Sequence, residues 1–402
     1  MNKILIISVD FFPKIGGISL MTHHLANGFC QNGWEVSVLA PADALIPADY
    51  SALYSLVVDR ESNPKRRANL EGLRERRRIF DFLCSLGEFD HVLLLHPFYY
   101  GPAALDYARS IQATISCYFH GFELKSQLLH RDKLVQRVLG KFSPIKTLRQ
   151  STLCLAKSVD YVFTNSSETA EIVRPVRSSN VVITGCGLDV ETYREKLMEP
   201  KVSSLKSGIV EQGMTLGFVG RIVESKNLEF LIDLLRHLPS YKLLVVGDGP
   251  KKKELQKRAK VSGVGDRITW AGRVSEDGKW EAIDKMDLLC LPSRKLNKGQ
   301  VEGFGIVMLE ATLRGIPVAV SHEGGMRDFI LEKNGIYLDI NNKKNSADKI
   351  QSFFQDGGEV LRTVSRAQKL LGESLTYDKI AEGLIELLQS SQLDAEEDKV
   401  VA

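Results

Sequence analysis

Two glutamates flank a glycine-rich segment in a pattern that suits a ligand with phosphates in its middle. Glu302 and Glu310 stand eight positions apart, and an apolar helical pattern runs up to the second of them. The residues after the first glutamate are Gly303, Phe304, Gly305 and Ile306. Backbone N–H groups at a helix start bind phosphate oxygens, and glycine lets the backbone come close to them. The two carboxylates can accept hydrogen bonds from hydroxyl groups on either side of the phosphates. A molecule with hydroxyls, a diphosphate and then more hydroxyls is a nucleotide-sugar.

The same stretch has a simpler interpretation, in which it is only the start of a surface helix. In that case Glu302 and Glu310 are solvated charges on an N-capped amphipathic helix. The stretch alone does not decide between the two interpretations. The elements that must position these residues decide between them.

The first forty residues predict a βαβ unit that opens towards a ligand. A buried strand over Lys3–Val9 leads into a loop that ends at Gly16 and Gly17, and a helix then runs to about Gln31. A second strand follows over 34–39, so the connection is parallel and right-handed. The glycine spacing is not GxGxxG, and no acidic residue ends the second strand, which argues against a nicotinamide cofactor. The glycine loop still lies where such sheets bind ligands.

A histidine stands at the end of another predicted strand of the same sheet. The strand covers Thr114–Phe119 and is followed directly by His120 and Gly121. A histidine at a strand end is often structural. One that precedes a glycine at the carboxyl edge of a parallel sheet is a candidate for ligand contact.

A second alternation of strands and helices fills the C-terminal half. Its first strand, over 214–219, leads into a loop with Arg221 and Lys226, and a later strand is followed by Arg273 and Val274. The strand over Leu288–Leu291 precedes the Glu302–Glu310 segment. The fold class is therefore α/β, with two doubly wound Rossmann-like domains that face each other across a cleft.

The polar composition of some stretches predicts where the domains end. The prediction is an N-terminal domain over 1–190, a linker over 191–212, a C-terminal domain over 213–375, a helix over 376–392 that packs back on the first domain, and a disordered acidic tail over 393–402.

Composition excludes several classes of function. The chain has 402 residues and a net charge of +3, which gives no reason to expect nucleic acid binding. The six cysteines are scattered without metal-ligand spacing, and no apolar run approaches a membrane span, so we expect a cytoplasmic protein with reduced thiols and no metal. Between Lys65 and Arg149 there are fifteen Lys/Arg against eight Asp/Glu, which indicates either a solvated basic face or contact with an anionic membrane surface.

Together these residues resemble the retaining glycosyltransferases of family 4, which have the GT-B fold. The resemblance covers nearly the whole chain and is strongest for bacterial mannosyltransferase-like members that use GDP-mannose. It rests on Arg221 with Lys226, on EGFGIVMLEA from Glu302 to Ala311, on Pro292-Ser293 and Gly324-Gly325 around that segment, and on Gly16-Gly17, His120-Gly121 and 185–189 in the first half.

The resemblance implies how the donor is held in the C-terminal domain. Arg221 and Lys226 would neutralise the diphosphate leaving group, so that the enzyme needs neither a metal nor another cofactor. Glu310 would hold the ribose hydroxyls, and Glu302 would hold hydroxyls of the sugar. The backbone of Gly303, Phe304, Gly305 and Ile306 would approach the sugar and phosphates, and Arg273 with Val274 would contact the base.

The N-terminal domain would complete the site and bind the acceptor. Gly16 and Gly17 would border the phosphates, and His120 would contact the donor sugar near its anomeric carbon. The implied catalytic set is thus His120, Arg221, Lys226 and Glu302, and the implied acceptor is a hydroxyl of a glycan or a lipid-linked molecule. Rival interpretations are a nucleotide-sugar epimerase of the same architecture, a glycan phosphorylase or starch-synthase-like enzyme, and a non-catalytic nucleotide-sugar-binding module.

Overall fold

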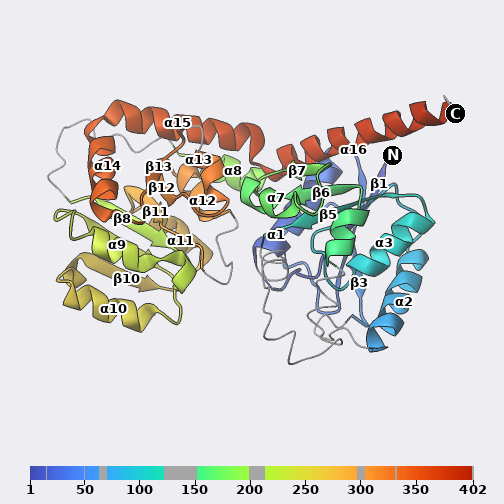
Figure 1. Cartoon of the computed structure of the whole chain (residues 1–402), viewed down its shortest axis with the longest axis horizontal. Coiled ribbons are helices and arrows are strands. Elements are labelled where there is room, and N and C mark those ends of the chain that lie inside the picture. The colour runs from blue at the N-terminus through green and yellow to red at the C-terminus, as the bar shows by residue number, and fades with distance from the viewer. Residues whose placement is uncertain are drawn as a thin grey trace. The chain divides into compact units, whose positions relative to one another are not determined.

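The chain forms two compact units, each built on one parallel sheet. The computed structural model describes residues 1–14, 16–48, 50–62, 70–121, 152–198, 213–296, 304–330 and 333–400. The first unit comprises Met1–Asp189 together with Leu375–Ala402, and the second comprises Val190–Ser374 (Figure 1). None of the helices described is both long and apolar enough to cross a membrane.

The first unit contains a seven-stranded parallel sheet with the strand order β3-β2-β1-β4-β5-β6-β7. Its strands are β1 (Lys3–Ile7), β2 (Glu35–Pro41), β3 (Ser55–Asp59), β4 (His91–Leu94), β5 (Thr114–Phe119), β6 (Tyr161–Thr164) and β7 (Val181–Ile183). Its labelled helices are α1 (Gly17–Gln31), α2 (Leu70–Ser85), α3 (Gly101–Ser110), α7 (Ser167–Val173) and α16 (Tyr377–Val400), and residues 152–158 are also helical.

Alternate residues of each strand belong to two separate hydrophobic cores, one on each face of this sheet. Ile4 and Ile6 pack with apolar residues of α1 and α16, whereas Leu5 and Ile7 pack with those of α2 and α3. This is the period of two that a strand imposes on its side chains. Because both faces are covered, β1 is an unbroken apolar run and not an alternating one.

The C-terminal helix belongs to the first unit, where it lies against α1. The two helices approach so closely that a Cβ at Gly28 would lie 2.9 Å from the carbonyl oxygen of Tyr377. The helix begins at Tyr377 and continues to Val400, past residue 392, where the sequence predicted a disordered tail. The tail contains Leu393, Ala395, Glu396, Glu397 and Lys399, which have good helix propensity and favour this extension.

The second unit contains a six-stranded parallel sheet with the order β10-β9-β8-β11-β12-β13. Its strands are β8 (Thr215–Val219), β9 (Lys242–Val246), β10 (Ile268–Gly272), β11 (Leu288–Leu291), β12 (Val318–Ser321) and β13 (Ile336–Leu338). Its helices are α8 (Val190–Lys196), η2 (Glu224–Lys226), α9 (Leu228–Leu234), α10 (Lys252–Val261), η3 (Gly265–Arg267), α11 (Glu276–Ile283), α12 (Val307–Leu313), α13 (Met326–Ile330), α14 (Lys343–Gln355) and α15 (Gly357–Ser374). Helix α8 occupies the start of the stretch that we expected to be a linker.

Both sheets reverse their strand order next to their first strand, which confirms the predicted pair of doubly wound α/β domains. In the first unit the reversal lies between β1 and β4, and in the second between β8 and β11. Ligands of open parallel sheets bind at the carboxyl ends of the strands beside this switch point. The loops after these four strands are therefore the candidate ligand-binding loops.

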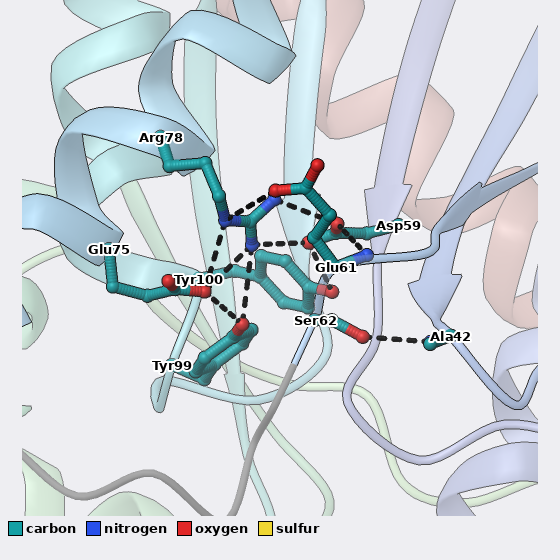
Figure 2. A network of polar contacts seen from close by, with 8 residues as sticks. All are labelled: Ala42, Asp59, Glu61, Ser62, Glu75, Arg78, Tyr99 and Tyr100. Atoms are coloured by element: carbon teal, nitrogen blue, oxygen red, sulfur yellow. Dashed lines mark hydrogen bonds and ion pairs between the residues drawn. The ribbon is translucent and has the colours of Figure 1, made fainter.

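A network of charged and phenolic side chains joins the loops after β3 and β4 to helix α2 (Figure 2). Asp59, the last residue of β3, accepts two hydrogen bonds of 2.8 Å from the guanidinium of Arg78. Arg78 also donates to Glu75, and the hydroxyl of Tyr99 donates to the same Glu75 oxygen at 2.5 Å. The hydroxyl of Tyr100 lies 3.3 Å from Asp59. Hydrogen bonding to Asp59 raises the pKa of Arg78 above its ordinary value.

Three neighbouring arginines of α2, which belong to the basic stretch between Lys65 and Arg149, each have a carboxylate partner. Arg76 makes two hydrogen bonds of 2.7 Å to Asp106. Arg77 pairs with Asp81, four residues further along the same helix. Asp106, the partner of Arg76, and Asp59, a partner of Arg78, come from other elements, so no local pattern in the sequence indicates these two pairs.

We predict that Arg78→Met destabilises the first unit by about 2–4 kcal/mol, because it leaves the carboxylate of Asp59 buried without its bidentate partner. The lower end of this range reflects the partial exposure of Arg78, whose side chain is 24% accessible whereas that of Asp59 is 2%. Urea-induced unfolding followed by circular dichroism measures the change. The matched control is Arg77→Met on the same helix, where the pair with Asp81 is exposed. Equal shifts for the two variants would contradict the importance of the Asp59 pair.

Candidate functional site

Two cations follow strand β8, the strand beside the switch point of the second sheet. The strand ends at Val219, and Gly220 with φ 152° then turns the chain towards Arg221. Arg221 is exposed, whereas Lys226, the last residue of the short helix η2, is half-buried. Burial lowers the pKa of the Lys226 ammonium from its ordinary value to about 8. A desolvated ammonium gains more from an anionic ligand than a solvated one does.

The loop after β9 packs directly against this cationic loop. A Cβ on Gly247 would lie 1.9 Å from the carbonyl oxygen of Gly220, and one on Gly249 would lie 2.2 Å from that of Ile222. Gly247 also has φ 130°, which only glycine adopts readily. The two glycines around Asp248 are therefore needed so that the backbones after β8 and β9 can meet.

The loop after β11, on the other side of the switch point, is hydrogen-bonded to the same loop. The side-chain amide of Asn227 donates to the carbonyl of Pro292 at 3.0 Å. The backbone N–H of Arg294 donates to the carbonyl of Ser225 at 2.8 Å, and its guanidinium pairs with Glu229. These contacts place the loop that leads into the Glu302–Glu310 segment beside Lys226.

The described part of that segment forms a tight turn and then a helix. Phe304 is buried and Gly305 has φ 83°, where a Cβ would meet the side chain of Met326 at 3.2 Å. Ile306 is the N-cap of α12, a helix of seven residues. Glu302 and Gly303 lie outside the described residues. The predicted glycine turn before a helix is thus present from Phe304 onwards.

Glu310 lies in the first turn of α12 and is held by a lysine that the sequence did not single out. Its Oε1 accepts a hydrogen bond of 2.7 Å from Nζ of Lys279, on helix α11. Burial raises the pKa of Glu310 above its ordinary value, although the charge of Lys279 opposes the increase. The spacing of Lys279 from Glu276 was visible as an ordinary helix-surface pair. The contact with Glu310, 31 residues away, was not.

Arg273 and Val274 follow β10 at the same edge of the sheet. Gly272, with φ 73°, ends the strand, and its carbonyl accepts a hydrogen bond of 2.7 Å from the N–H of Gly247. The chain after β10 therefore lies beside the Gly247–Gly249 turn. The second unit thus brings Arg221, Lys226, Arg273, Val274, Phe304, Gly305, Ile306 and Glu310 to the carboxyl side of one sheet.

The first unit places its predicted residues at the corresponding edge of its own sheet. Gly16 caps helix α1, which begins at Gly17. The N–H of Gly16 donates to Oγ of Ser19 at 2.8 Å, and this hydroxyl donates back to the Gly16 carbonyl at 2.9 Å. The glycine loop after β1 is therefore held in place by its own helix.

His120 lies between the ends of β4 and β5. Its Nε2 donates to the carbonyl of Leu95 at 2.9 Å, because a carbonyl oxygen can only accept. The ring stacks on Tyr118, with 5.0 Å between the ring centres. His96 lies close enough that repulsion from His120, together with the larger effect of burial, lowers its pKa to about 3. The imidazole of His120 is thus oriented by two fixed contacts.

Two family models match the chain, one in each unit. The model described as "Glycosyltransferase Family 4" matches residues 15–192, and the one described as "Glycosyl transferases group 1" matches residues 203–370. Between them they span most of the sequence and all the candidate residues.

Several curated proteins are similar over long stretches. A GDP-mannose-dependent alpha-(1-6)-phosphatidylinositol monomannoside mannosyltransferase of Mycobacterium tuberculosis is 25% identical over 403 residues, which cover 97% of this chain and 98% of that protein. The lipopolysaccharide core biosynthesis glycosyltransferase LpsE of Rhizobium meliloti is 26% identical over 58% of this chain and 65% of its own length.

Solved structures share the whole architecture at lower identity. The HepE protein of Anabaena in complex with UDP has a TM-score of 0.69 at 19% identity and covers 97% of this chain and 100% of its own. The sucrose-phosphate synthase of Thermosynechococcus elongatus has a TM-score of 0.71 at 18% identity and covers 98% of this chain and 100% of its own. These similarities establish the fold.

If Lys226 binds phosphate, the affinity for an anion should fall as the pH rises through about 8. A bound anion favours the ammonium form and raises the pKa of Lys226 above its value of about 8 in the empty site. Binding is then strongest below pH 8 and weakens by up to about tenfold per pH unit above it.

Calorimetric titration with inorganic pyrophosphate at pH 7, 8 and 9 measures this loss. Lys226→Arg is the control, because its guanidinium stays protonated and any remaining pH dependence comes from the ligand itself. Superimposable pH profiles for the two proteins would show that Lys226 does not contact the anion.

Proposed function

The chain belongs to the group 1 and family 4 glycosyltransferases, and we propose that it transfers a hexose-type sugar from a nucleotide-sugar to a hydroxyl of a glycan or lipid-linked acceptor. The proposed role of this reaction is in cell-surface polysaccharide or glycoconjugate biosynthesis. Its fold is GT-B, as the sequence predicted. One observation carries the proposal. Beside the β8–β11 switch point, the loop with Arg221 and the half-buried Lys226 is hydrogen-bonded to the loop that leads into the glycine turn at Gly305.

The proposed donor is GDP-mannose or a UDP-sugar. The mycobacterial relative is described as GDP-mannose-dependent, and the Anabaena HepE structure contains UDP. In the proposed pose, the diphosphate lies between Arg221, Lys226 and the turn at Gly305, and the ribose hydroxyls reach Glu310. Glu302 holds hydroxyls of the sugar, and Arg273 with Val274 borders the base.

The proposed mechanism is a front-face displacement with retention of configuration. As the bond between the anomeric carbon and the phosphate breaks, negative charge grows on the diphosphate, and Arg221 and Lys226 stabilise it. The acceptor hydroxyl attacks from the same face, and its proton passes to the departing phosphate oxygen. His120 supports the positively charged sugar through a hydrogen bond, and Gly16 with Gly17 borders the phosphates. No nucleophilic carboxylate is required, unlike in retaining glycosidases.

The proposal includes independence from divalent metals. The fixed charges of Arg221 and Lys226 supply the positive potential that a metal supplies in other transferases. Among the described residues, no group of three or more His, Cys, Asp or Glu side chains is arranged to hold a metal.

We predict that Arg221→Ala lowers turnover by about 10²–10³ without unfolding the protein, as the loss of one fixed charge-stabilising donor does. The assay follows release of nucleoside diphosphate from GDP-mannose and from UDP-sugars, with and without chelator. Lys253→Ala, a lysine of α10, is the control for loss of one positive charge. Normal turnover in Arg221→Ala would exclude the phosphate role, and loss of turnover in chelator would exclude metal independence. A pure binding module would bind the donor and release no diphosphate.

We also propose that the protein is cytoplasmic and acts at an anionic membrane surface, where a lipid-linked acceptor would be located. The support is the excess of basic residues between Lys65 and Arg149. Within this region Arg74 and Arg77 are exposed, and Arg77 is 76% accessible.

Arg74→Glu with Arg77→Glu should therefore weaken binding to vesicles that contain phosphatidylglycerol, because each basic residue near such a surface contributes about 1 kcal/mol. Vesicle flotation at low and high salt measures the change. Arg78 is left intact in this experiment because it holds the buried Asp59. Unchanged partitioning of the double variant would identify this part of the surface as ordinary solvated surface.

A further inference from the structure

Helices α11 and α12 are joined by a lysine that lies between two carboxylates. Nζ of Lys279 is 2.7 Å from Oε1 of Glu310 and 2.6 Å from Oε1 of Glu276. The ammonium also lies 5.4 Å from the centre of the Trp280 ring. Glu276 is 71% exposed, so its pair with Lys279 is an ordinary surface contact.

The pair between Lys279 and Glu310 is different because both partners are largely withdrawn from water. The side chain of Lys279 is 19% accessible and that of Glu310 is 12%. Burying two charges is costly unless each is paired and hydrogen-bonded. A surface helix needs no such arrangement, so the pair calls for a role in this site.

The arrangement leaves one side of the Glu310 carboxylate for another partner. Lys279 donates to Oε1, and among the described residues no other hydrogen bond reaches this carboxylate. An ionised carboxylate has about four acceptor positions. Oε2 is therefore the natural place for a donor group from a ligand.

Lys279 also connects the two parts of the chain that lie nearest to the expected nucleoside. It follows Arg273 and Val274 within the same connection between β10 and β11, whereas Glu310 follows the glycine turn at Gly305. A pair between these elements sets the position of the carboxylate relative to both.

We propose that Lys279 is a positioning residue for the donor's ribose, which fixes the Glu310 carboxylate through Oε1 so that Oε2 accepts hydrogen bonds from the ribose hydroxyls. This inference rests on the proposed nucleotide-sugar donor and adds a specificity-determining residue to that site.

The electrostatics of the pair give this role a pH signature. Burial raises the pKa of Glu310, the nearby charge of Glu276 adds to the increase, and Lys279 opposes it. The two carboxylates in turn keep the pKa of Lys279 above its ordinary value despite burial. Without Lys279, the pKa of Glu310 must rise further, since the one cause that lowers it is gone. As the pH is lowered, Glu310 of the variant is therefore protonated at a higher pH than Glu310 of the wild type, and its ionised carboxylate is lost earlier.

The test compares nucleotides with and without ribose hydroxyls. Calorimetry measures the affinities of GDP, UDP and ADP and of their 2′,3′-dideoxy counterparts between pH 5.5 and 8.5, for the wild-type protein and for Lys279→Met. Lys279→Arg retains the positive charge and should behave like the wild type. Glu276→Gln is the matched control, because it removes the exposed partner of Lys279 and leaves Glu310 paired. Lys279→Gln replaces Lys279→Met if the latter fails to fold.

We expect the wild type to prefer the ribonucleotide by about 10- to 100-fold, which is the range for hydrogen bonds to a charged group. In Lys279→Met this preference should fall to within about threefold of unity and should decrease further at low pH, whereas affinity for the dideoxy form stays unchanged. The unchanged dideoxy affinity separates positioning from general damage to the site.

Two results would overturn the inference. If Lys279→Met keeps the preference for the ribonucleotide, Lys279 does not position Glu310. If it loses affinity equally for both forms, Lys279 acts on another part of the nucleotide. A wild-type protein that binds none of the nucleotides would instead reject the proposed function, so the two failures are distinguishable.

Discussion

The reversal of strand order between β8 and β11 is the constraint on which the candidate site depends. The chain leaves β8 towards β9 on one side of the sheet and leaves β11 towards β12 on the other. The loops after these two strands therefore start as neighbours and lead into different halves of the unit. Two hydrogen bonds then hold them together, from the side-chain amide of Asn227 to the Pro292 carbonyl and from the backbone N–H of Arg294 to the Ser225 carbonyl. The cationic loop after β8 and the loop after β11 meet as a consequence of topology, even though 65 residues separate Asn227 from Pro292.

Partial burial shifts the pKa values of two charged residues of the candidate site. Burial lowers the pKa of the Lys226 ammonium to about 8, so its charge changes within an accessible pH range. Glu310 has lost solvent as well, but a neighbouring ammonium compensates. The ion pair with Lys279 fixes the position of the Glu310 carboxylate. The lowered pKa of Lys226 makes the proposed anion site sensitive to pH.

The sequence predicted the sheets well because buried parallel strands are continuous apolar runs. The bounds of β5 and β11 agree with the structure to the residue. The strands β3 and β13 were not predicted. β13 has only three residues, and β3 is an edge strand whose residues are mostly half-buried, so its pattern is weak. Lys279 was missed for a different reason. Its local partner Glu276 explained it fully, and a contact between helices that follow different strands leaves no periodic trace in the sequence.

The first unit illustrates why local residue types can mislead about charge. Arg76, Arg77 and Arg78 form a basic run in the sequence, yet Arg78 is the centre of a network that also contains Asp59, Glu75 and Tyr99. Tyr99 has φ 59°, a left-handed conformation that costs a non-glycine residue about 1–3 kcal/mol and persists only where its surroundings impose it.

The hydrogen bond from Tyr99 to Glu75, and the pair of Arg78 with Asp59 behind it, provide those surroundings. The same loop begins at Leu95, whose carbonyl accepts the hydrogen bond from His120. The position of the loop after β4 is thus set at one end by the imidazole and at the other by the Arg78 network. Both units thus hold a loop in place at the carboxyl edge of their sheet. The first unit uses a buried ion pair for this, and the second uses glycines and hydrogen bonds to backbone carbonyls.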